Sequence, residues 1–201
     1  MRSASVTYPG LKKMEAFLVS TAVVAIGEIG DKTQLLALLL AARFRRPVPI
    51  VLGILFATLA NHTLAGLVGE WVRNAVDPDY LRWGLGLSFL AVALWSLKPD
   101  SFDEQPQTLG RYGVFMVTLA TFFVAEMGDK TQLATVMLAA KFPALVAVIA
   151  GTTCGMLIAD VPAVLLGKVA SQRIPFKAVR MVAALLFAAL GDATLMNLSL
   201  W

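Results

Sequence analysis

The sequence contains little charge and only one cysteine and one histidine. Charged residues make up 15% of its 201 residues, against roughly 25% in an average soluble domain, and 58% are hydrophobic. A single cysteine cannot close an intramolecular disulfide, so Cys154 is expected to be a packing residue in an apolar helix. Zinc and copper sites would lack the imidazole and thiolate ligands that they favour. This composition excludes an ordinary soluble domain.

The chain also lacks any polar stretch long enough to fold as a separate soluble domain. Six apolar stretches account for nearly all of it, and each approaches or exceeds the roughly 20 residues that cross a bilayer core as a helix. We therefore expect an all-α integral membrane protein with six transmembrane helices, whose chemistry lies inside the helix bundle. The stretches are residues 14–42, 48–71, 80–97, 112–140, 143–168 and 177–198.

The longest connection between these stretches is acidic and contains two prolines, Pro99 and Pro106. Such a composition is typical of a solvated linker. We expect it to join two halves of the chain. The predicted division is a first three-helix repeat at residues 1–98, an acidic cytoplasmic linker at 99–111 and a second three-helix repeat at 112–201.

Basic residues concentrate near the ends of the apolar stretches, so the net charge of +4 does not indicate a nucleic-acid partner. Cytoplasmic loops of membrane proteins carry an excess of lysine and arginine. With six spans, nine basic residues would lie on one side of the membrane and six on the other. The side with nine is expected to be cytoplasmic, which places both termini outside the cytoplasm. The nine are Arg43, Arg45, Arg46, Lys98, Arg111, Lys168, Arg173, Lys177 and Arg180, and the six are Arg2, Lys12, Lys13, Arg73, Arg82 and Lys141.

The chain contains an internal repeat. Shifting the sequence by 98 residues aligns residues 28–44 with 126–142 and gives 11 identities in 17 positions. Weaker matches continue beyond this block, as between Gly53 and Gly151. Because a unit of three spans ends on the side opposite to its start, the second copy is expected to be inverted relative to the first. Equivalent residues would then meet near the midplane of the membrane.

Each copy carries the motif Glu-x-Gly-Asp-Lys-Thr-Gln in its first apolar stretch, at residues 28–34 and 126–132. A carboxylate or lysine at the bilayer centre costs roughly 2.5 to 3.5 kcal/mol on insertion scales. Apolar replacements would insert more easily, so we expect these groups to form a functional ion site. The six groups are Glu28, Asp31, Lys32, Glu126, Asp129 and Lys130.

On a continuous helix, residues three and four apart share a face, so the acids and the lysine of each motif would point the same way. Gly30 and Gly128 would let a facing helix approach closely, or let the backbone bend and offer a carbonyl. Four carboxylates and two lysines sum to −4 + 2 = −2, which matches one divalent cation. Two protons could replace that cation, so we hypothesise cation–proton exchange. Oxygen ligands favour magnesium, calcium or manganese.

Four further polar residues lie within the apolar stretches. The repeat aligns His62 with Asp160, and Asn61 precedes His62. These three are candidate ligands or proton relays, or else core polar groups satisfied by a neighbour. Asp192 aligns with Leu94 and is either functional or an interfacial residue near a helix end.

The doubled motif, with one copy in each three-helix half and an acidic linker between them, resembles the manganese exporter and divalent cation/proton antiporter family. The resemblance covers essentially the whole chain and implies transport of manganese, with calcium used by some relatives and protons exchanged by several. The short chain is similar to bacterial members, which implies export from the cytoplasm across the inner membrane by alternating access, with no cofactor besides the transported ion. The family pattern implies that Glu28, Asp31, Glu126 and Asp129 bind the cation, with Thr33, Gln34, Thr131 and Gln132 beside them. The two threonines could instead bond back to the preceding turn.

Other functions remain compatible with some of these residues. A calcium/proton antiporter, or a proton or monovalent cation pathway, would also use buried acids. An intramembrane enzyme could use paired acids as general acid and base, but the sequence has no nucleophile motif and no recognisable substrate-binding loop, so we expect no enzyme. A structural subunit would explain the lysines but not the symmetrical oxygen donors. The expected partners are a divalent metal ion and the lipid bilayer, and the oligomeric state is left open.

Overall fold

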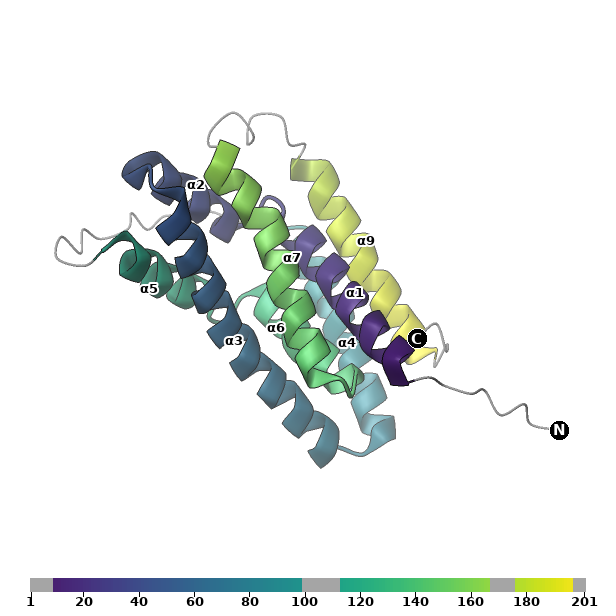
Figure 1. The fold of residues 1–201 in the computed structure, drawn as a ribbon. Helices are drawn as coiled ribbons and strands as arrows, with labels where there is room; N and C mark the ends of the chain where they lie inside the picture. Colours follow the sequence, from purple (N-terminus) through teal and green to yellow (C-terminus); the bar gives the residue numbers. More distant parts are fainter. Residues whose placement is uncertain (1–8, 99–112, 167–175, 197–201) are drawn as a thin grey trace.

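The computed structural model describes residues 9–98, 113–166 and 176–196, and this part of the chain is built from α-helices without a strand (Figure 1). For these residues, the expectation of an all-α fold is confirmed. The linker predicted at residues 99–111 lies outside the described residues. The helices are α1 (Pro9–Glu28), α2 (Lys32–Phe44), α3 (Pro47–Ala75), α4 (Pro78–Ser96), α5 (Val114–Glu126), α6 (Lys130–Lys141), α7 (Leu145–Leu166) and α9 (Phe176–Leu195).

Four of the six apolar stretches form one helix each, namely α3, α4, α7 and α9. Within the described residues, three helical segments are long and apolar enough to cross a membrane on their own. Prolines at the first turn of α3 and α4 suit helix starts, because the amide that proline lacks has no partner inside the helix there. The three segments are Pro47–Ala75, Leu145–Leu165 and Lys177–Leu195.

The remaining two stretches, residues 14–42 and 112–140, are each broken into two helices. The expectation that each motif lies along one continuous helix is therefore wrong. Gly30 and Gly128 have φ angles of 83° and 75°. Residues with a side chain rarely adopt this left-handed conformation, whereas glycine adopts it readily. Each glycine thus turns the chain between α1 and α2, or between α5 and α6.

The two acids of each motif flank the break instead of sharing a helix face. Glu28 and Glu126 are the last residues of α1 and α5. Asp31 and Asp129 are the N-cap residues of α2 and α6, and the Asp31 side chain accepts a hydrogen bond from the Lys32 amide at 2.6 Å. An aspartate at an N-cap stabilises a helix start. Each motif therefore ends one helix and begins the next.

Replacing Gly128 with alanine is expected to lower the free energy of unfolding by about 1–2 kcal/mol, because alanine would be held in the left-handed region. A Cβ at Gly128 meets no atom within 4 Å, so the loss would come from backbone strain alone. Thermal unfolding in detergent measures it. Gly84→Ala is the control: Gly84 lies inside α4, its Cβ also has open space, and alanine there should be neutral or stabilising. Equal losses in both variants would refute the strain explanation.

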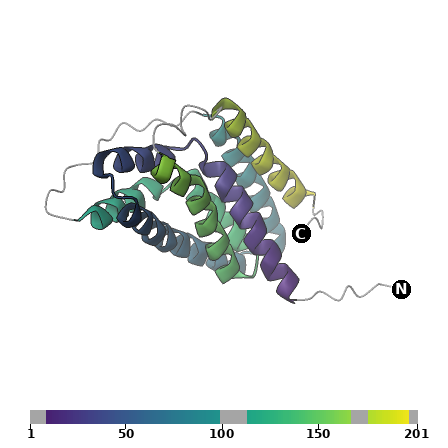
Figure 2. The same cartoon turned by 45° about the horizontal axis from the view of Figure 1, so that its top comes forward.

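The packing joins the first half of the chain to the second. α1 packs against α7, and α5 packs against α3, as Figures 1 and 2 show. These two contacts correspond under the repeat. A Cβ on Gly151 would collide with the carbonyl oxygen of Phe17, and a Cβ on Gly53 would lie 3.0 Å from the carbonyl oxygen of Phe115. Phe17 and Phe115 are themselves 98 residues apart. Small residues allow such close approach between helices in membranes.

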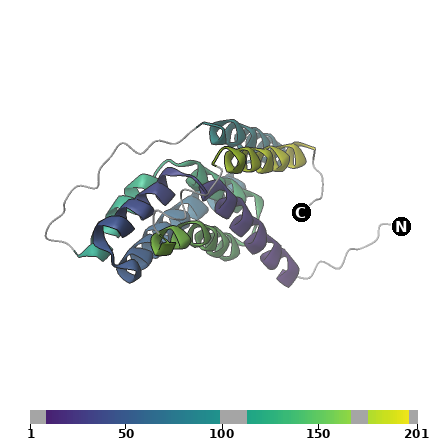
Figure 3. The same cartoon turned by 90° about the horizontal axis from the view of Figure 1, so that it is seen from above.

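α4 and α9 form a pair on one side of the bundle (Figure 3). They approach closely at two glycines, since a Cβ on Gly191 would lie 3.0 Å from the Gly86 carbonyl oxygen. This pair contacts the remaining helices mainly through α6 and α1. Buried side chains such as Phe89 and Phe187 fill the space between them and α6. The described helices thus form an outer pair, α4 and α9, and an inner group that contains both helix breaks.

Candidate cation-binding site

The two helix breaks bring acidic side chains from both motifs together in the interior. Glu28, Asp31 and Glu126 are fully buried, and Asp129 is 2% exposed. One oxygen from each of Glu28, Glu126 and Asp129 lies within 4.8 Å of the other two. Three carboxylates at this spacing can bind one hard cation after small side-chain movements. The structure therefore places carboxylates of both repeats at one point.

Each motif's lysine pairs with the other motif's aspartate. The Lys32 Nζ lies 3.2 Å from Asp129 Oδ1, and the Lys130 Nζ lies 3.2 Å from Asp31 Oδ2. The side chain of Lys130 is 4% exposed, whereas that of Lys32 is 25% exposed. Sequence spacing had placed each lysine beside the acids of its own motif. The crossed pairs neutralise both aspartates and connect the two halves.

Neither glutamate forms a salt bridge in the described part of the chain, although the charge of Lys130 also acts on Glu28. The Thr33 hydroxyl donates to Glu28 Oε2 at 2.5 Å, and the Thr131 hydroxyl donates to Glu126 Oε2 at 3.2 Å. The Oε1 atom of each glutamate has no hydrogen-bond partner among these residues. A buried carboxylate without compensation is costly, so the glutamates require positive charge from a cation or protons.

Gln34 and Gln132 support the breaks. The Oε1 atom of Gln34 accepts a hydrogen bond from the Gly30 amide at 2.9 Å, and that of Gln132 accepts one from the Gly128 amide at 2.7 Å. Gln34 also donates through Nε2 to the Ala159 carbonyl oxygen at 3.0 Å. These bonds hold the glycines in their turns. The amide oxygens are thus engaged by the backbone rather than directed at the carboxylates.

Helix ends add to the electrostatics of the cluster. Glu28 and Glu126 lie at the C-terminal ends of α1 and α5, where the helix dipole is negative and attracts cations. Asp31 and Asp129 lie at the N-terminal ends of α2 and α6, where the positive end of the dipole stabilises a carboxylate. The ends of α1 and α5 therefore reinforce the demand of the glutamates for positive charge.

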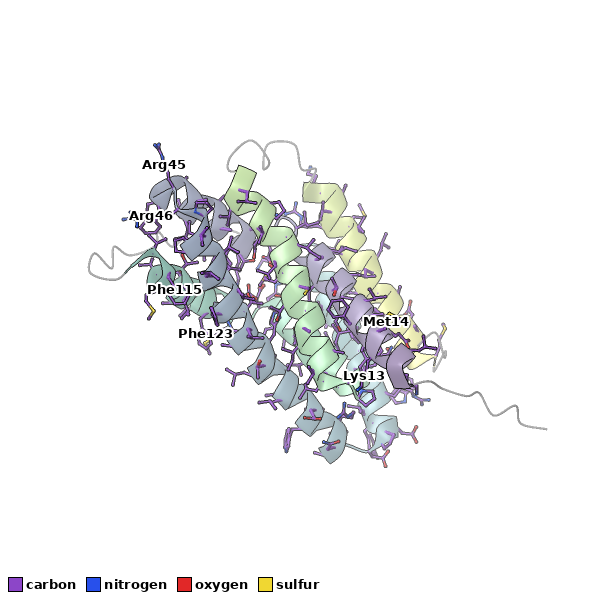
Figure 4. All side chains as sticks on the ribbon, in the orientation of Figure 1. Lys13, Met14, Arg45, Arg46, Phe115 and Phe123 are labelled. Atoms are coloured by element: carbon purple, nitrogen blue, oxygen red, sulfur yellow. The ribbon has the colours of Figure 1, made fainter. Side chains whose placement is uncertain are left out.

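The additional polar residues lie at different places. His62 and Asn61 are buried on α3, and Asp160 is buried on α7, which packs against α3. Asn61 donates to the carbonyl oxygen of Phe123 at 2.9 Å, and Phe123 is labelled on α5 in Figure 4. Neither ring nitrogen of His62 and neither oxygen of Asp160 has a hydrogen-bond partner in the described residues. Asp192 is exposed on α9, outside the cluster.

Two contacts were not anticipated from the sequence. The Arg73 guanidinium, near the end of α3, donates to the carbonyl oxygens of Ala139 and Phe142 at 3.1 and 2.8 Å. It thereby satisfies carbonyls at the C-terminal end of α6, the helix that begins with Lys130. The second contact is the bond from Gln34 to α7. The only sequence signal for the Arg73 contact was the presence of an arginine near a helix end. No feature of the sequence indicated the bond from Gln34 to α7.

Comparison with known proteins gives consistent matches. A family model described as "Divalent cation/proton antiporter GDT1" matches residues 16–104 and 114–200, so each matched segment contains one motif. A Vibrio cholerae protein named "Putative manganese exporter" is 48% identical over 182 residues, or 90% of each chain. A GDT1-like protein of Synechocystis is 29% identical over 87% of this chain and 93% of the relative. The Saccharomyces cerevisiae protein named "Divalent cation/proton antiporter GDT1" is 25% identical over 87% of this chain and 81% of its own. No solved structure matches the chain.

Proposed function

Because this chain belongs to the divalent cation/proton antiporter GDT1 family, we propose that it exports manganese from the cytoplasm in exchange for protons. The observation that supports this most directly is the cluster of Glu28, Glu126 and Asp129, in which neither glutamate forms a salt bridge among the described residues. The family is one of antiporters rather than enzymes, which is consistent with the expectation that the chain is not an enzyme.

The charge of the cluster favours exchange of one divalent cation for two protons. Each Lys–Asp pair is neutral, so Glu28 and Glu126 leave a charge of −2. One Mn²⁺ or two protons would compensate it equally. Carboxylate oxygens suit Mn²⁺, Ca²⁺ and Mg²⁺. The relative named for manganese supports Mn²⁺ as the cargo of this chain.

The proposed membrane arrangement has six spans in two inverted repeats. In it, α1 with α2 and α5 with α6 are interrupted spans whose broken ends meet near the midplane, an arrangement found in many transporters. The division into residues 1–98, 99–111 and 112–201, the location in a bacterial inner membrane and the non-cytoplasmic termini belong to this proposal. The match of corresponding contacts, α1 with α7 and α5 with α3, supports it.

Alternating access would use the two crossed ion pairs in turn. The Lys130–Asp31 pair is almost fully covered, while Lys32 of the other pair is 25% exposed. We infer that this conformation is closed on the Lys130 side and more open on the Lys32 side. Movement of one repeat against the other would reverse the exposure of the two lysines.

Inside-out membrane vesicles that contain the protein test the function. With an acidic lumen, external Mn²⁺ is expected to enter while protons leave, and an agent that collapses the pH gradient should slow uptake severalfold. Uptake that is unchanged by collapse of the gradient would contradict proton exchange. Added Ca²⁺ and Na⁺ serve as competitors. Inhibition of Mn²⁺ uptake by Ca²⁺ but not by Na⁺ would favour a general divalent cation antiporter. Absence of Mn²⁺ uptake together with collapse of the pH gradient on addition of Na⁺ would favour a monovalent pathway.

A further inference from the structure

Asp160 is a buried acid that the repeated motifs do not explain. It lies on α7, it is fully buried, and neither of its carboxylate oxygens has a hydrogen-bond partner among the described residues. Burying an unpaired carboxylate costs several kcal/mol, and an asparagine or leucine at this position would avoid that cost. The carboxylate therefore requires a cation or a proton, because the described side chains do not compensate it.

The position of Asp160 is fixed relative to the first helix break. The preceding carbonyl, that of Ala159, accepts a hydrogen bond from Gln34 Nε2 at 3.0 Å. The same glutamine holds the Gly30 amide at 2.9 Å. Gln34 thus links α7, at the residue before Asp160, to the turn between Glu28 and α2. The attachment brings the backbone of Asp160 to the edge of the carboxylate cluster.

Asp160 also interacts electrostatically with the cluster itself. Its charge acts on both Glu28 and Glu126, although its oxygens lie outside the 4.8 Å grouping that Glu28, Glu126 and Asp129 form. Three unpaired acids from α1, α5 and α7 therefore share one buried region, with a combined charge of −3 when all are ionised. Mutual repulsion among them would destabilise the fold unless a cation lies between them or protons neutralise them.

This third acid has no acidic counterpart in the other repeat. The position equivalent to Asp160 is His62 on α3, which is also buried without a hydrogen-bond partner in the described residues. The crossed Lys–Asp pairs and the two glutamates are shared by both repeats, whereas the acid on α7 is not. The negative charge around the cluster is consequently greater on the α7 side than on the α3 side.

We propose that Asp160 is an additional carboxylate of the cation site, contributed by α7 from outside both motifs, and that it strengthens binding of a divalent cation. The proposal rests on the proposed function, in that a cation binds between Glu28 and Glu126. It adds a residue on one side only, so the cation would lie nearer to α7 than to α3. The affinity of such oxygen sites depends on the number of charged ligands, which makes the effect measurable.

The test is Mn²⁺ binding by purified protein in detergent, with free Mn²⁺ followed by electron paramagnetic resonance. Asp160→Asn is expected to weaken binding about tenfold or more, because the site loses one of its charged oxygens. Asp160→Glu keeps the charge and should bind within a few-fold of the wild type. Asp192→Asn is the matched control: it removes an acid exposed on α9 and should leave binding unchanged.

A second measurement separates binding from folding. A ligand that binds only the folded state raises the unfolding temperature, so Mn²⁺ should stabilise the wild type but stabilise Asp160→Asn much less at the same concentration. The exchange of His62→Asp together with Asp160→His moves the acid to the equivalent position on α3. Substantial recovery of the Mn²⁺ stabilisation in this double variant is expected, since the acid would approach the same cluster from the opposite repeat.

The outcomes distinguish this inference from the proposed function. Asp160→Asn with wild-type Mn²⁺ affinity, alongside loss of binding in Glu126→Gln, would overturn the role of Asp160 and leave the proposed function intact. Absence of Mn²⁺ binding by the wild type would overturn both. If Asp160→Asn does not fold, the double variant is compared with Asp160→His alone: greater Mn²⁺ stabilisation in the double variant supports the inference, and equal stabilisation contradicts it.

Discussion

Glu126→Gln and Glu28→Gln are each expected to abolish cation transport while the protein stays folded in the membrane. Each substitution removes one of the two glutamates that form no salt bridge in the described residues, so the crossed pairs remain and the cation site loses one negative charge. Losing one partner of a buried charged contact typically costs about 2–5 kcal/mol, or roughly thirtyfold to several thousandfold in affinity. The unfolding temperature should be unchanged or higher, because glutamine removes an uncompensated buried charge.

The measurement is manganese content in cells that lack their own manganese exporters, with and without this chain. Wild-type protein should lower it, and neither glutamine variant should. Asp79→Asn is the control, since Asp79 is 85% exposed at the start of α4. Normal export by either glutamine variant would refute the two-motif site. Unchanged content of every divalent metal in cells with the wild type would refute manganese export itself.

Lys130→Met is expected to destabilise the fold much more than Lys32→Met. Both lysines pair with an aspartate at 3.2 Å, but Lys130 and Asp31 are almost completely covered by protein, whereas Lys32 is 25% exposed. Removing one partner of a buried pair costs about 3–5 kcal/mol, because the remaining charge stays buried. At the Lys32 position, partial exposure lets the surroundings compensate Asp129, and the loss should be well below that.

Thermal unfolding of the two variants measures the difference. The double variant with Lys130→Met and Asp31→Asn should recover much of the lost stability, since it removes both charges together. Its transport need not recover. Equal destabilisation by the two lysine variants would show that the burial of the pair does not determine its contribution. A double variant no more stable than Lys130→Met would show that the charge left on Asp31 is not the cause.

The sequence predicted the helical fold, the family and the position of the charged motifs well. Apolar stretches are easily recognised, and four of them became single helices with ends displaced by a few residues. The doubled motif indicated the family that the comparison shows. These features depend on local composition and on the repeat, and both are contained in one sequence.

A bend at the two glycines was one of the alternatives, but full helix breaks were not predicted, because apolar residues continue on both sides of each motif. A signal for them was nevertheless present. Gly30 followed by Asp31, with Gln34 three residues later, is the pattern of a left-handed glycine, an N-cap and a supporting side chain. The prediction of one continuous helix was based on the spacing of the charged residues and overlooked this pattern.

The crossed ion pairs could not be predicted, since they depend on how two distant segments meet. Lys32 is adjacent in sequence to Asp31 but pairs with Asp129. The same holds for the bond from Gln34 to Ala159, which joins residues 125 positions apart. Pairing of this kind is decided by the tertiary arrangement, which the hydrophobic pattern leaves undetermined.

The crossed pairs also set an order of events during biosynthesis. Lys130 is translated 99 residues after Asp31, which at about 5–20 residues per second corresponds to roughly 5–20 s. Throughout this interval α1 and α2 exist without the helices against which they pack, and Asp31 exists without its lysine. Insertion of the first half into the bilayer therefore precedes its folding, and the nascent chain must keep its first motif hydrated or shielded by the insertion machinery until α6 has been made.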